Sequence, residues 1–223
     1  GLAEGEVSIT VTSTENADIT ATCTVTVTPA KDNDDAILAG GVIISGIGGD
    51  DLPFTDVSFR NYYYNAVKWA VDKGITSGTS RYTFSPDVAC TRAQVVTFLW
   101  RAAGSPAPML NKNPFTDVHT SDYYYDAVLW AVQNGITTGT SATTFSPDAT
   151  VTRAQVVTFL WRANGQPAAG NSGFVDVSSN AYYAKAVDWA FVNGITTGMD
   201  YGAFDPDTAC TRAQIVTFLY RAR

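Results

Sequence analysis

Three arginines at matching points of a repeated motif are the residues of this sequence best suited to binding chemistry. The motif is Thr-Arg-Ala-Gln, and its copies contain Arg92, Arg153 and Arg212. Because a threonine that can cap a helix precedes each one, we expect each arginine in a first helical turn, where the dipole makes a cation mildly unfavourable. Such violations of local rules are typical of functional or strained sites.

Two interpretations of these arginines follow from the residues alone. In the first, each guanidinium and the uncapped N–H groups of its helix converge on a carboxylate or phosphate, which makes an anion site. In the second, each arginine forms a structural ion pair with a nearby aspartate. The sequence leaves both interpretations open.

The residues after each motif predict a buried helix. Thr91 and Gln94 form a capping box, and the residues after them, from Val95 to Trp100, leave little room for a polar face. Three such helices predict a mainly α fold with a central three-helix bundle of pseudo-threefold symmetry. Each helix ends in an arginine suited to the negative end of its dipole: Arg101, Arg162 and Arg221.

Each buried helix closes a longer repeated module. The modules open with Phe-x-Asp-Val at Phe54, Phe115 and Phe174, and continue through an aromatic cluster and an amphipathic helix that ends in Gly-Ile. A loop containing Phe-x-Pro-Asp leads to the capped helix, so each module is helix, loop, helix. The predicted modules are residues 54–108, 109–168 and 169–223.

The region before the modules has a different pattern. Residues 1–29 contain two alternating runs, Val7 to Ser13 and Ile19 to Val27, that predict a β-hairpin. Their pattern resembles the closing strands of a bacterial Ig-like domain of group 2. Because a lone hairpin is marginally stable, its partners must come from an upstream segment or another chain.

Residues 30–53 have the composition of a linker. The acidic run Asp32 to Asp35 lacks the central Gly and closing Glu of a calcium loop, so no metal or other cofactor is predicted. We expect the apolar run Val42 to Ile44 to pack on the repeats or on a neighbouring molecule.

Composition excludes several classes of function. A net charge of −7 and a pI near 4.5 argue against binding to nucleic acid or anionic membranes. No apolar run is long enough for membrane insertion, and the chain has no evident signal peptide.

Cys90 and Cys210 occupy equivalent positions that Val151 fills in the middle copy, which predicts a buried apolar role. The single histidine, His119, has no repeated partner, so no enzyme is expected here.

Together, the Phe-x-Asp-Val opening, the Gly-Ile helix end, the Phe-x-Pro-Asp turn and the Thr-Arg-Ala-Gln helix start resemble three tandem S-layer homology domains. The resemblance runs from about Phe54 to Arg223. The family usually has Glu where Gln94, Gln155 and Gln214 stand. Either residue closes a capping box, but the change removes three negative charges near the arginines.

The resemblance implies non-covalent anchoring of a surface protein to the bacterial cell wall. The implied partner is a secondary cell-wall polysaccharide, typically bearing a pyruvate ketal, whose carboxylate suits a guanidinium fork. The implied location is the extracellular cell surface. The residues implied to bind glycan are Arg92, Arg153, Arg212, Asp56, Asp117, Asp176, Trp69, Trp130, Trp189, Gly78, Gly139 and Gly198.

Each of these assignments has a structural alternative. The aspartates either bind glycan, cap the following turn or pair with the arginines; the tryptophans are otherwise core; and the glycines otherwise supply a positive φ. Because module 3 departs most from the others, we rank the grooves of Arg92 and Arg153 above that of Arg212. An alternative function is a structural subunit that assembles with copies of itself into a surface lattice or filament by N-terminal strand addition.

Overall fold

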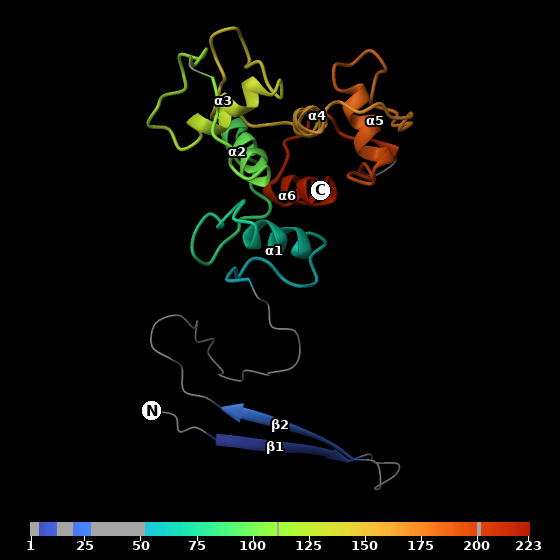
Figure 1. Cartoon of the computed structure of the whole chain (residues 1–223). Helices are drawn as coiled ribbons and strands as arrows, with labels where there is room; N and C mark the ends of the chain where they lie inside the picture. Colours follow the sequence, from blue (N-terminus) through green and yellow to red (C-terminus); the bar gives the residue numbers. More distant parts are fainter. Residues whose placement is uncertain (1–4, 13–19, 28–51, 111, 200–201) are drawn as a thin grey trace. The chain divides into compact units, whose positions relative to one another are not determined.

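The computed structural model describes residues 5–12, 20–27, 52–110, 112–199 and 202–223. The chain divides into two units, Gly1–Asp51 and Leu52–Arg223. In the first, strands β1 (Gly5–Thr12) and β2 (Thr20–Val27) pair antiparallel, with Val7 opposite Val25 (Figure 1). The predicted turn, the acidic run Asp32 to Asp35 and the apolar run Val42 to Ile44 lie outside the described residues.

The second unit is mainly helical, which confirms the predicted class. In the described residues of this unit the helices come in three pairs, one pair in each predicted module (Figure 1). The helices are α1 (Tyr64–Asp72), α2 (Arg92–Ala102), α3 (Tyr125–Gln133), α4 (Arg153–Ala163), α5 (Ala184–Val192) and α6 (Arg212–Arg221).

The second helix of each module begins with the predicted capping box. In α2, the Thr91 hydroxyl accepts the N–H of Gln94, and the Gln94 side chain accepts the N–H of Thr91 at 3.1 Å. Helices α4 and α6 begin in the same way. This reciprocal bonding satisfies backbone donors that a helix start otherwise leaves free, so the starting point is fixed.

The first helix of each module ends at a glycine, as predicted. In α1, the N–H of Gly74 bonds to the carbonyl of Val71, and that of Ile75 to Ala70 at 2.8 Å. This is the Schellman arrangement, which needs the positive φ of 67° that Gly74 adopts. Helices α3 and α5 repeat it.

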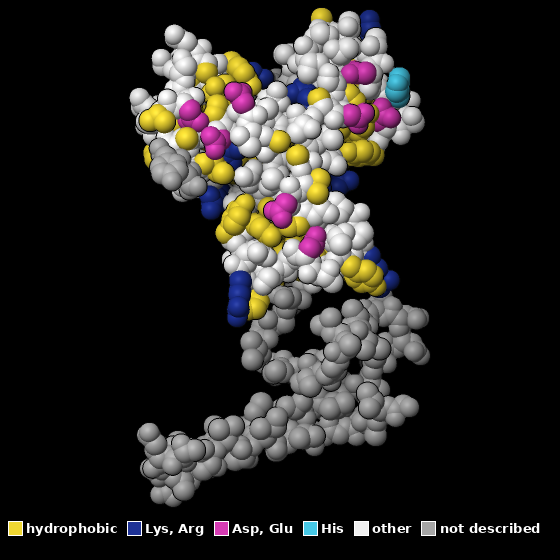
Figure 2. All heavy atoms as spheres, turned by 180° about the vertical axis from the view of Figure 1, so that it is seen from behind, with side chains coloured by type: hydrophobic (Ala, Val, Ile, Leu, Met, Phe, Trp, Pro, Cys, Tyr) yellow, Lys and Arg dark blue, Asp and Glu magenta, His cyan; other side chains and the backbone are white. Residues whose placement is uncertain are grey.

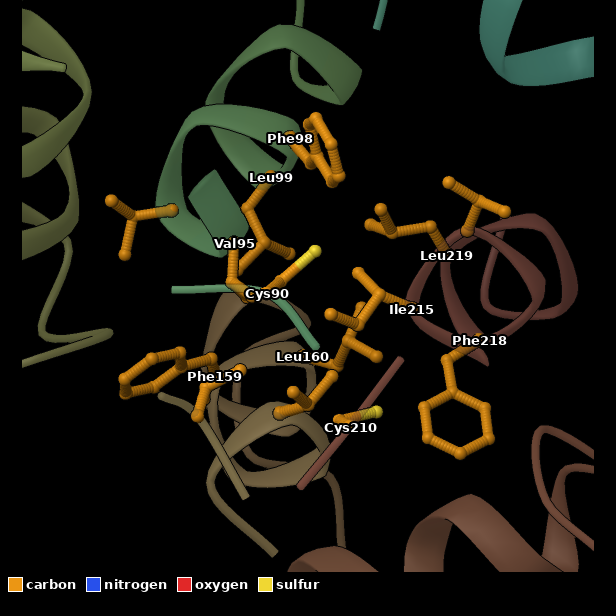
Figure 3. Close-up of a cluster of buried hydrophobic side chains, with 14 of the residues drawn as sticks. Cys90, Val95, Phe98, Leu99, Phe159, Leu160, Cys210, Ile215, Phe218 and Leu219 are labelled. Carbon is orange, nitrogen blue, oxygen red and sulfur yellow. The ribbon is translucent and has the colours of Figure 1, made fainter. Parts of the chain in front are cut away.

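Helices from different modules pack together. Helices α2, α4 and α6 contact one another pairwise, and Figure 3 shows side chains of all three, including Leu99, Leu160 and Leu219, lying in one apolar cluster. Each first helix packs on a second helix of another module: α3 on α2, α5 on α4, and α1 on α6. We call these three interfaces seam 1–2, seam 2–3 and seam 3–1.

A ring of backbone hydrogen bonds joins the residues before the three capping threonines. The N–H of Val151 donates to Cys90 at 3.0 Å, that of Cys210 to Val151 at 2.9 Å, and that of Cys90 to Cys210 at 3.1 Å. All three side chains are fully buried, which confirms the predicted apolar role. Burial raises the pKa of Cys90 to about 11 and that of Cys210 to about 12, so both thiols are neutral at physiological pH.

Candidate functional site

The three motif arginines are buried, and each reaches into another module. Arg92 is 4% exposed, and its Nε donates to the carbonyl of Phe145 in module 2 at 2.9 Å. Its guanidinium lies over the rings of Phe145 and Phe159, 5.0 and 5.4 Å from their centroids. Cation–π contact and a buried hydrogen bond therefore join module 1 to module 2.

The other two arginines repeat this contact around the unit. Arg153 of module 2 bonds to the carbonyl of Phe204 in module 3 at 2.9 Å, and Arg212 of module 3 bonds to that of Phe84 in module 1 at 2.8 Å. Both guanidinium groups also lie over phenylalanine rings of the modules they enter. The arginines thus connect the modules in a closed cycle.

The outer nitrogen of the guanidinium distinguishes the three copies. Nη2 of Arg212 donates to Thr76 at 3.2 Å, and Nη2 of Arg92 donates to Thr137 at 3.5 Å. Nη2 of Arg153 is buried and has no hydrogen-bond partner among the described residues. An unpaired buried donor is costly, so the middle arginine is the least well satisfied of the three.

The expectation of uncapped helix N–H groups is wrong. The N–H of Arg92 donates to Ala149 at 2.9 Å, and the N–H of Ala93 donates to Pro147 at 3.0 Å. Helices α4 and α6 begin with equivalent bonds. These first-turn donors are therefore used between modules.

The ion-pair alternative is not found either. In the described part of the chain, the observed ion pair is Lys68–Asp72 at 3.6 Å, and no carboxylate pairs with a motif arginine. Burial lowers the pKa of Arg92, Arg153 and Arg212, because desolvation disfavours their charged form. The rings and carbonyls around each guanidinium offset that cost in place of a counter-ion.

The aspartates of the module openings hold the loop that the arginines enter. The Asp56 carboxylate accepts the N–H groups of Phe84 at 2.8 Å and Ser85 at 2.7 Å. Ser85 has a φ of 58° and precedes Pro86, a conformation that sterics disfavour. The carboxylate therefore fixes a strained turn. The two predicted structural alternatives were a cap on the turn that follows the aspartate and an ion pair with an arginine, and this contact is neither of them.

Asp117 and Asp176 make the same paired bonds in modules 2 and 3. Burial alone would raise the pKa of Asp117, but hydrogen bonds from the N–H groups of Phe145 and Ser146 outweigh it. The net pKa of Asp117 is lowered, so its charged form stabilises the loop.

The three predicted glycines are required by the packing of the same loops. Gly78 has a φ of 88°, and a Cβ there would lie 2.5 Å from the Phe54 ring and 2.6 Å from the carbonyl of Thr83. Gly139 and Gly198 face equivalent contacts. The geometry favours the structural alternative for these glycines. The predicted reason was a positive φ, and the close contacts of a Cβ add a steric reason.

The three tryptophans belong to the apolar core or pack against it. Trp130 and Trp189 are buried, at 9% and 6% exposed. Trp69 is partly buried and packs edge-on against Tyr220 of α6, with ring centroids 5.7 Å apart. These contacts favour the core alternative.

The predicted residues meet in sets that cross module boundaries. Asp56 and Gly78 of module 1 and Arg212 of module 3 all contact the loop 76–85 or the ring packed on it. The N–H of Phe84 is bound by Asp56, while its carbonyl and ring are bound by Arg212. The equivalent sets are Arg92, Asp117 and Gly139, and Arg153, Asp176 and Gly198. Within the described residues, none of these contacts involves a tryptophan.

Sequence reasoning missed two accessible residue types. Tyr62, Tyr123 and Tyr182 are 65%, 62% and 62% exposed, whereas the sequence pattern indicated only that they belong to an aromatic cluster. Arg101 and Arg162 are partly exposed and Arg221 is exposed, yet they were assigned only to the helix dipole. Their repetition beside variable surface residues is the signal that could have identified them.

Within the described residues, a hollow lies at the interface of modules 2 and 3. A pocket of about 320 Å³ at seam 2–3 is lined by the end of α4, the segment after it and α5, including Trp161, Pro167, Lys185 and Asp188. On the face seen in Figure 2, hydrophobic and acidic side chains lie in small groups, and Lys and Arg side chains are scattered. On this face, positive charge therefore lies at separate points (Figure 2).

Comparison with known proteins agrees with this repeated architecture. The model of the S-layer homology domain matches residues 53–96, 114–157 and 173–216. The Surface-layer 125 kDa protein of Lysinibacillus sphaericus is 30% identical over 72% of this chain, and a Cell surface protein of Thermoanaerobacter kivui is 34% identical over 49%. An Endoglucanase of Bacillus sp. (strain KSM-635) is 37% identical over 50%.

This chain is much shorter than those relatives. The matched region covers 14% of the surface-layer protein, 15% of the cell surface protein and 12% of the endoglucanase. The similarity extends to proteins with different names. With three matched copies over more than half of its length, the chain belongs to the S-layer homology domain family.

Proposed function

We propose that this chain anchors a surface protein to the bacterial cell wall by binding an anionic, pyruvylated wall polysaccharide without a covalent bond. The observation that carries the proposal is the threefold family match, which covers all three modules. The relatives named as surface-layer and cell surface proteins support an extracellular, cell-surface location. Within the described residues, no helix has the length and apolar character needed to cross a membrane.

The ligand chemistry suits a chain of net charge −7. Such a chain repels anions in general, so an acidic polymer must be recognised at placed cations and not by a diffuse basic surface. A ketal carboxylate is planar and accepts two parallel hydrogen bonds from a guanidinium. Exposed tyrosine rings and accessible helix-end arginines offer aromatic and cationic contacts for such a sugar.

We infer that the three modules are related by pseudo-threefold symmetry about α2, α4 and α6. The pairwise contacts of these helices and the cyclic bonds among Cys90, Val151 and Cys210 support this arrangement. It would give three similar binding seams. A polymer with repeated ketals could occupy more than one of them, which would strengthen binding through effective concentration.

The motif arginines predicted to bind glycan join one module to the next, and the predicted aspartates and glycines hold or pack the loops that these arginines enter. We propose that Arg92, Arg153 and Arg212, with the aspartates and glycines, chiefly hold the binding loops in place, because they are buried or bonded to backbone. Arg153 has the greatest capacity for a further acceptor, since its Nη2 has no partner in the described structure. We propose no catalytic role for this chain.

A pull-down with purified bacterial cell walls tests this function. The full chain is expected to sediment with untreated walls and to stay in solution after mild acid has removed the pyruvate ketals. Walls re-acetylated after the same treatment control for the loss of acid-labile acetyl groups. Equal binding to treated and untreated walls would exclude the ketal as the recognised group.

A second candidate function is assembly into a surface lattice or filament. Its support is the β1–β2 pair, which in the described residues is a two-stranded sheet, so each strand has an edge that another strand could join. We propose that this pair is the end of an Ig-like domain. Removal of residues 1–52 should abolish polymer formation and leave wall binding intact; loss of wall binding would contradict our assignment of the two functions.

A further inference from the structure

The linker after module 1 is held against both helices of seam 1–2. The indole N–H of Trp100, in α2, donates to the carbonyl of Pro106 at 2.8 Å. The side-chain carbonyl of Gln133, in α3, accepts the N–H of Met109 at 2.7 Å. An aromatic residue and a polar residue of the seam therefore bind the backbone of a proline-containing segment.

The linker after module 2 is held in the same way at seam 2–3. The indole N–H of Trp161, in α4, donates to the carbonyl of Pro167 at 2.9 Å, and Asp188, in α5, accepts the N–H of Ser172 at 2.8 Å. Both linkers begin with Gly-x-Pro-Ala. Aromatic side chains that present a hydrogen-bond donor are a general means of binding proline-containing segments.

Seam 3–1 has the aromatic residues of such a site. Tyr220 of α6 occupies the position of the two linker-binding tryptophans, and its ring centroid lies 5.7 Å from that of Trp69 in α1. Among the described residues, no linker makes the equivalent hydrogen bond to Tyr220. Trp69 is partly exposed, whereas its counterparts Trp130 and Trp189 are buried. The aromatic pair of seam 3–1 is therefore the most accessible of the three.

Three cations lie beside this pair. The guanidinium of Arg223 lies 3.7 Å from the centroid of the Tyr220 ring and 5.9 Å from that of Trp69. Lys68 precedes Trp69 and pairs with the exposed Asp72 at 3.6 Å, and Lys73 is the C-cap of α1. The equivalent residues of the other two seams are neutral or acidic: Leu129, Asp188, Asn134, Asn193, Ala103 and Asn164.

We propose that seam 3–1 binds an extended, proline-containing segment of another polypeptide that carries acidic side chains. The docking face consists of Trp69, Tyr220, Lys68, Lys73 and Arg223. The proline rings pack on the aromatic pair, and the Tyr220 hydroxyl donates to a backbone carbonyl as the two tryptophans do. The acidic side chains of the partner pair with the three cations.

The positions of the cations favour a separate partner. The two internal linkers are covalently attached, so their effective concentration at seams 1–2 and 2–3 is high and no charge is needed to hold them. A segment of another molecule lacks this advantage and gains affinity and association rate from complementary charge. In a chain of net charge −7, the local excess of positive charge beside Tyr220 matches an acidic partner.

Calorimetric titration of the full chain at low ionic strength tests this inference. The probe is the acetylated and amidated heptapeptide Gly-Glu-Pro-Ala-Pro-Glu-Leu, which is the sequence of residues 104–110 with glutamate at its second and sixth positions. One control peptide has glutamine at both glutamate positions, and a second has glycine at both proline positions. We expect each control to bind at least about fivefold more weakly, since charge pairing or the preformed extended conformation is lost.

The charge of the docking face is tested with two variants of equal net charge. The first replaces its three cations: Lys68→Gln, Lys73→Gln and Arg223→Gln. The second replaces three exposed cations outside it: Arg60→Gln, Lys112→Gln and Lys185→Gln. We expect the first to bind the acidic peptide about tenfold more weakly and the second to bind it as the native chain does.

The aromatic pair is tested by substitutions that keep an apolar side chain. Trp69→Leu should weaken peptide binding about tenfold, because the ring contact is lost. Tyr220→Phe keeps the ring and removes the donor, so we expect a loss of about threefold to tenfold. Tyr220→Trp supplies the indole N–H found at Trp100 and Trp161 and should bind at least as tightly as the native chain. Thermal unfolding verifies that each variant is folded at the titration temperature.

Two results would overturn this inference. One is that the native chain does not bind the acidic peptide, or binds it as tightly as the variant without the three cations. The other is that purified wall polysaccharide displaces the peptide, which would make the docking face a glycan site. Loss of binding in the first charge variant but not in the second, with a requirement for proline and no competition by polysaccharide, supports a polypeptide partner.

Discussion

The two ends of the second helices carry the same residue type in different surroundings. At the starts, Arg92, Arg153 and Arg212 are 2% to 4% exposed and bonded to carbonyls of another module. At the ends, the arginines remain accessible and bond to a carbonyl of their own module. One helix thus carries a cation that joins modules and a cation that faces solvent.

This difference shows why repetition alone does not separate supporting residues from accessible ones. A pseudo-symmetric fold repeats its supports and its surface groups equally, so both sets of arginine occur three times. Burial and partners separate them: a guanidinium between two phenylalanine rings stabilises the fold, whereas an exposed guanidinium fixed by one bond can still bind an anion. Substitutions at the two sets test this division between buried, supporting arginines and accessible arginines.

The largest expected effect is on stability, from the loss of a helix-start arginine. Arg212→Ala removes a buried side chain and leaves the carbonyl of Phe84 without its donor, so we expect a loss of about 4 kcal/mol in the free energy of unfolding. The control Arg221→Ala changes an exposed residue and should cost about 1 kcal/mol or less. Urea denaturation measures both, and equal losses would contradict the division.

A slightly smaller effect is expected from the loop that Arg212 enters. Gly78→Ala places a Cβ 2.5 Å from the Phe54 ring at a φ of 88°, so it should cost about 3 kcal/mol. Gly74→Ala is the matched control, because Gly74 also has a positive φ but a Cβ there meets nothing within 4 Å. It should cost about 1 kcal/mol. Similar losses in the two variants would mean that loop packing is unimportant.

Local structure was largely predictable from the sequence. The capping boxes at Thr91, Thr152 and Thr211 and the glycine helix ends follow from contacts within a few residues, and each was confirmed. The mainly helical class and the burial of Cys90 and Cys210 were also confirmed. Short-range chemistry decides such features, so one sequence is enough to read them.

The contacts of the candidate site were less predictable, because they cross modules. No spacing indicates that Arg212 binds Phe84, which lies 128 residues away, or that Asp56 binds the backbone of Ser85. The use of the first helical N–H groups by another module was missed for the same reason. Which of the predicted residues contact glycan stays a prediction that binding measurements must test.

Acid should weaken the fold through Asp117. The pKa of the Asp117 carboxyl is lowered in the folded state, so its charged form adds stability that is fully present above the unfolded pKa, near 4, and is lost as the pH falls through the folded value. Asp117→Asn should therefore unfold more easily at pH 7, by about 1 to 2 kcal/mol, and show less change in stability between pH 5 and pH 3. Thermal unfolding across this range measures both. An unchanged pH dependence in Asp117→Asn would mean that other carboxyl groups control acid unfolding.

The smallest expected effect distinguishes one helix-start arginine from another. Nη2 of Arg212 donates to Thr76 at 3.2 Å, whereas Nη2 of Arg153 is buried with no partner in the described residues. Because Arg153 contributes one hydrogen bond fewer and carries an unmet desolvation cost, Arg153→Ala should destabilise the fold by about 1 kcal/mol less than Arg212→Ala. Both variants remove an arginine side chain that lies over an equivalent ring, Phe204 or Phe84. The difference between their losses in the free energy of unfolding therefore measures the contribution of Nη2. If urea denaturation gives equal losses, the outer nitrogen of Arg153 has a partner in solution, such as a bound water, and the three helix-start arginines are equivalent in energy as well as in position.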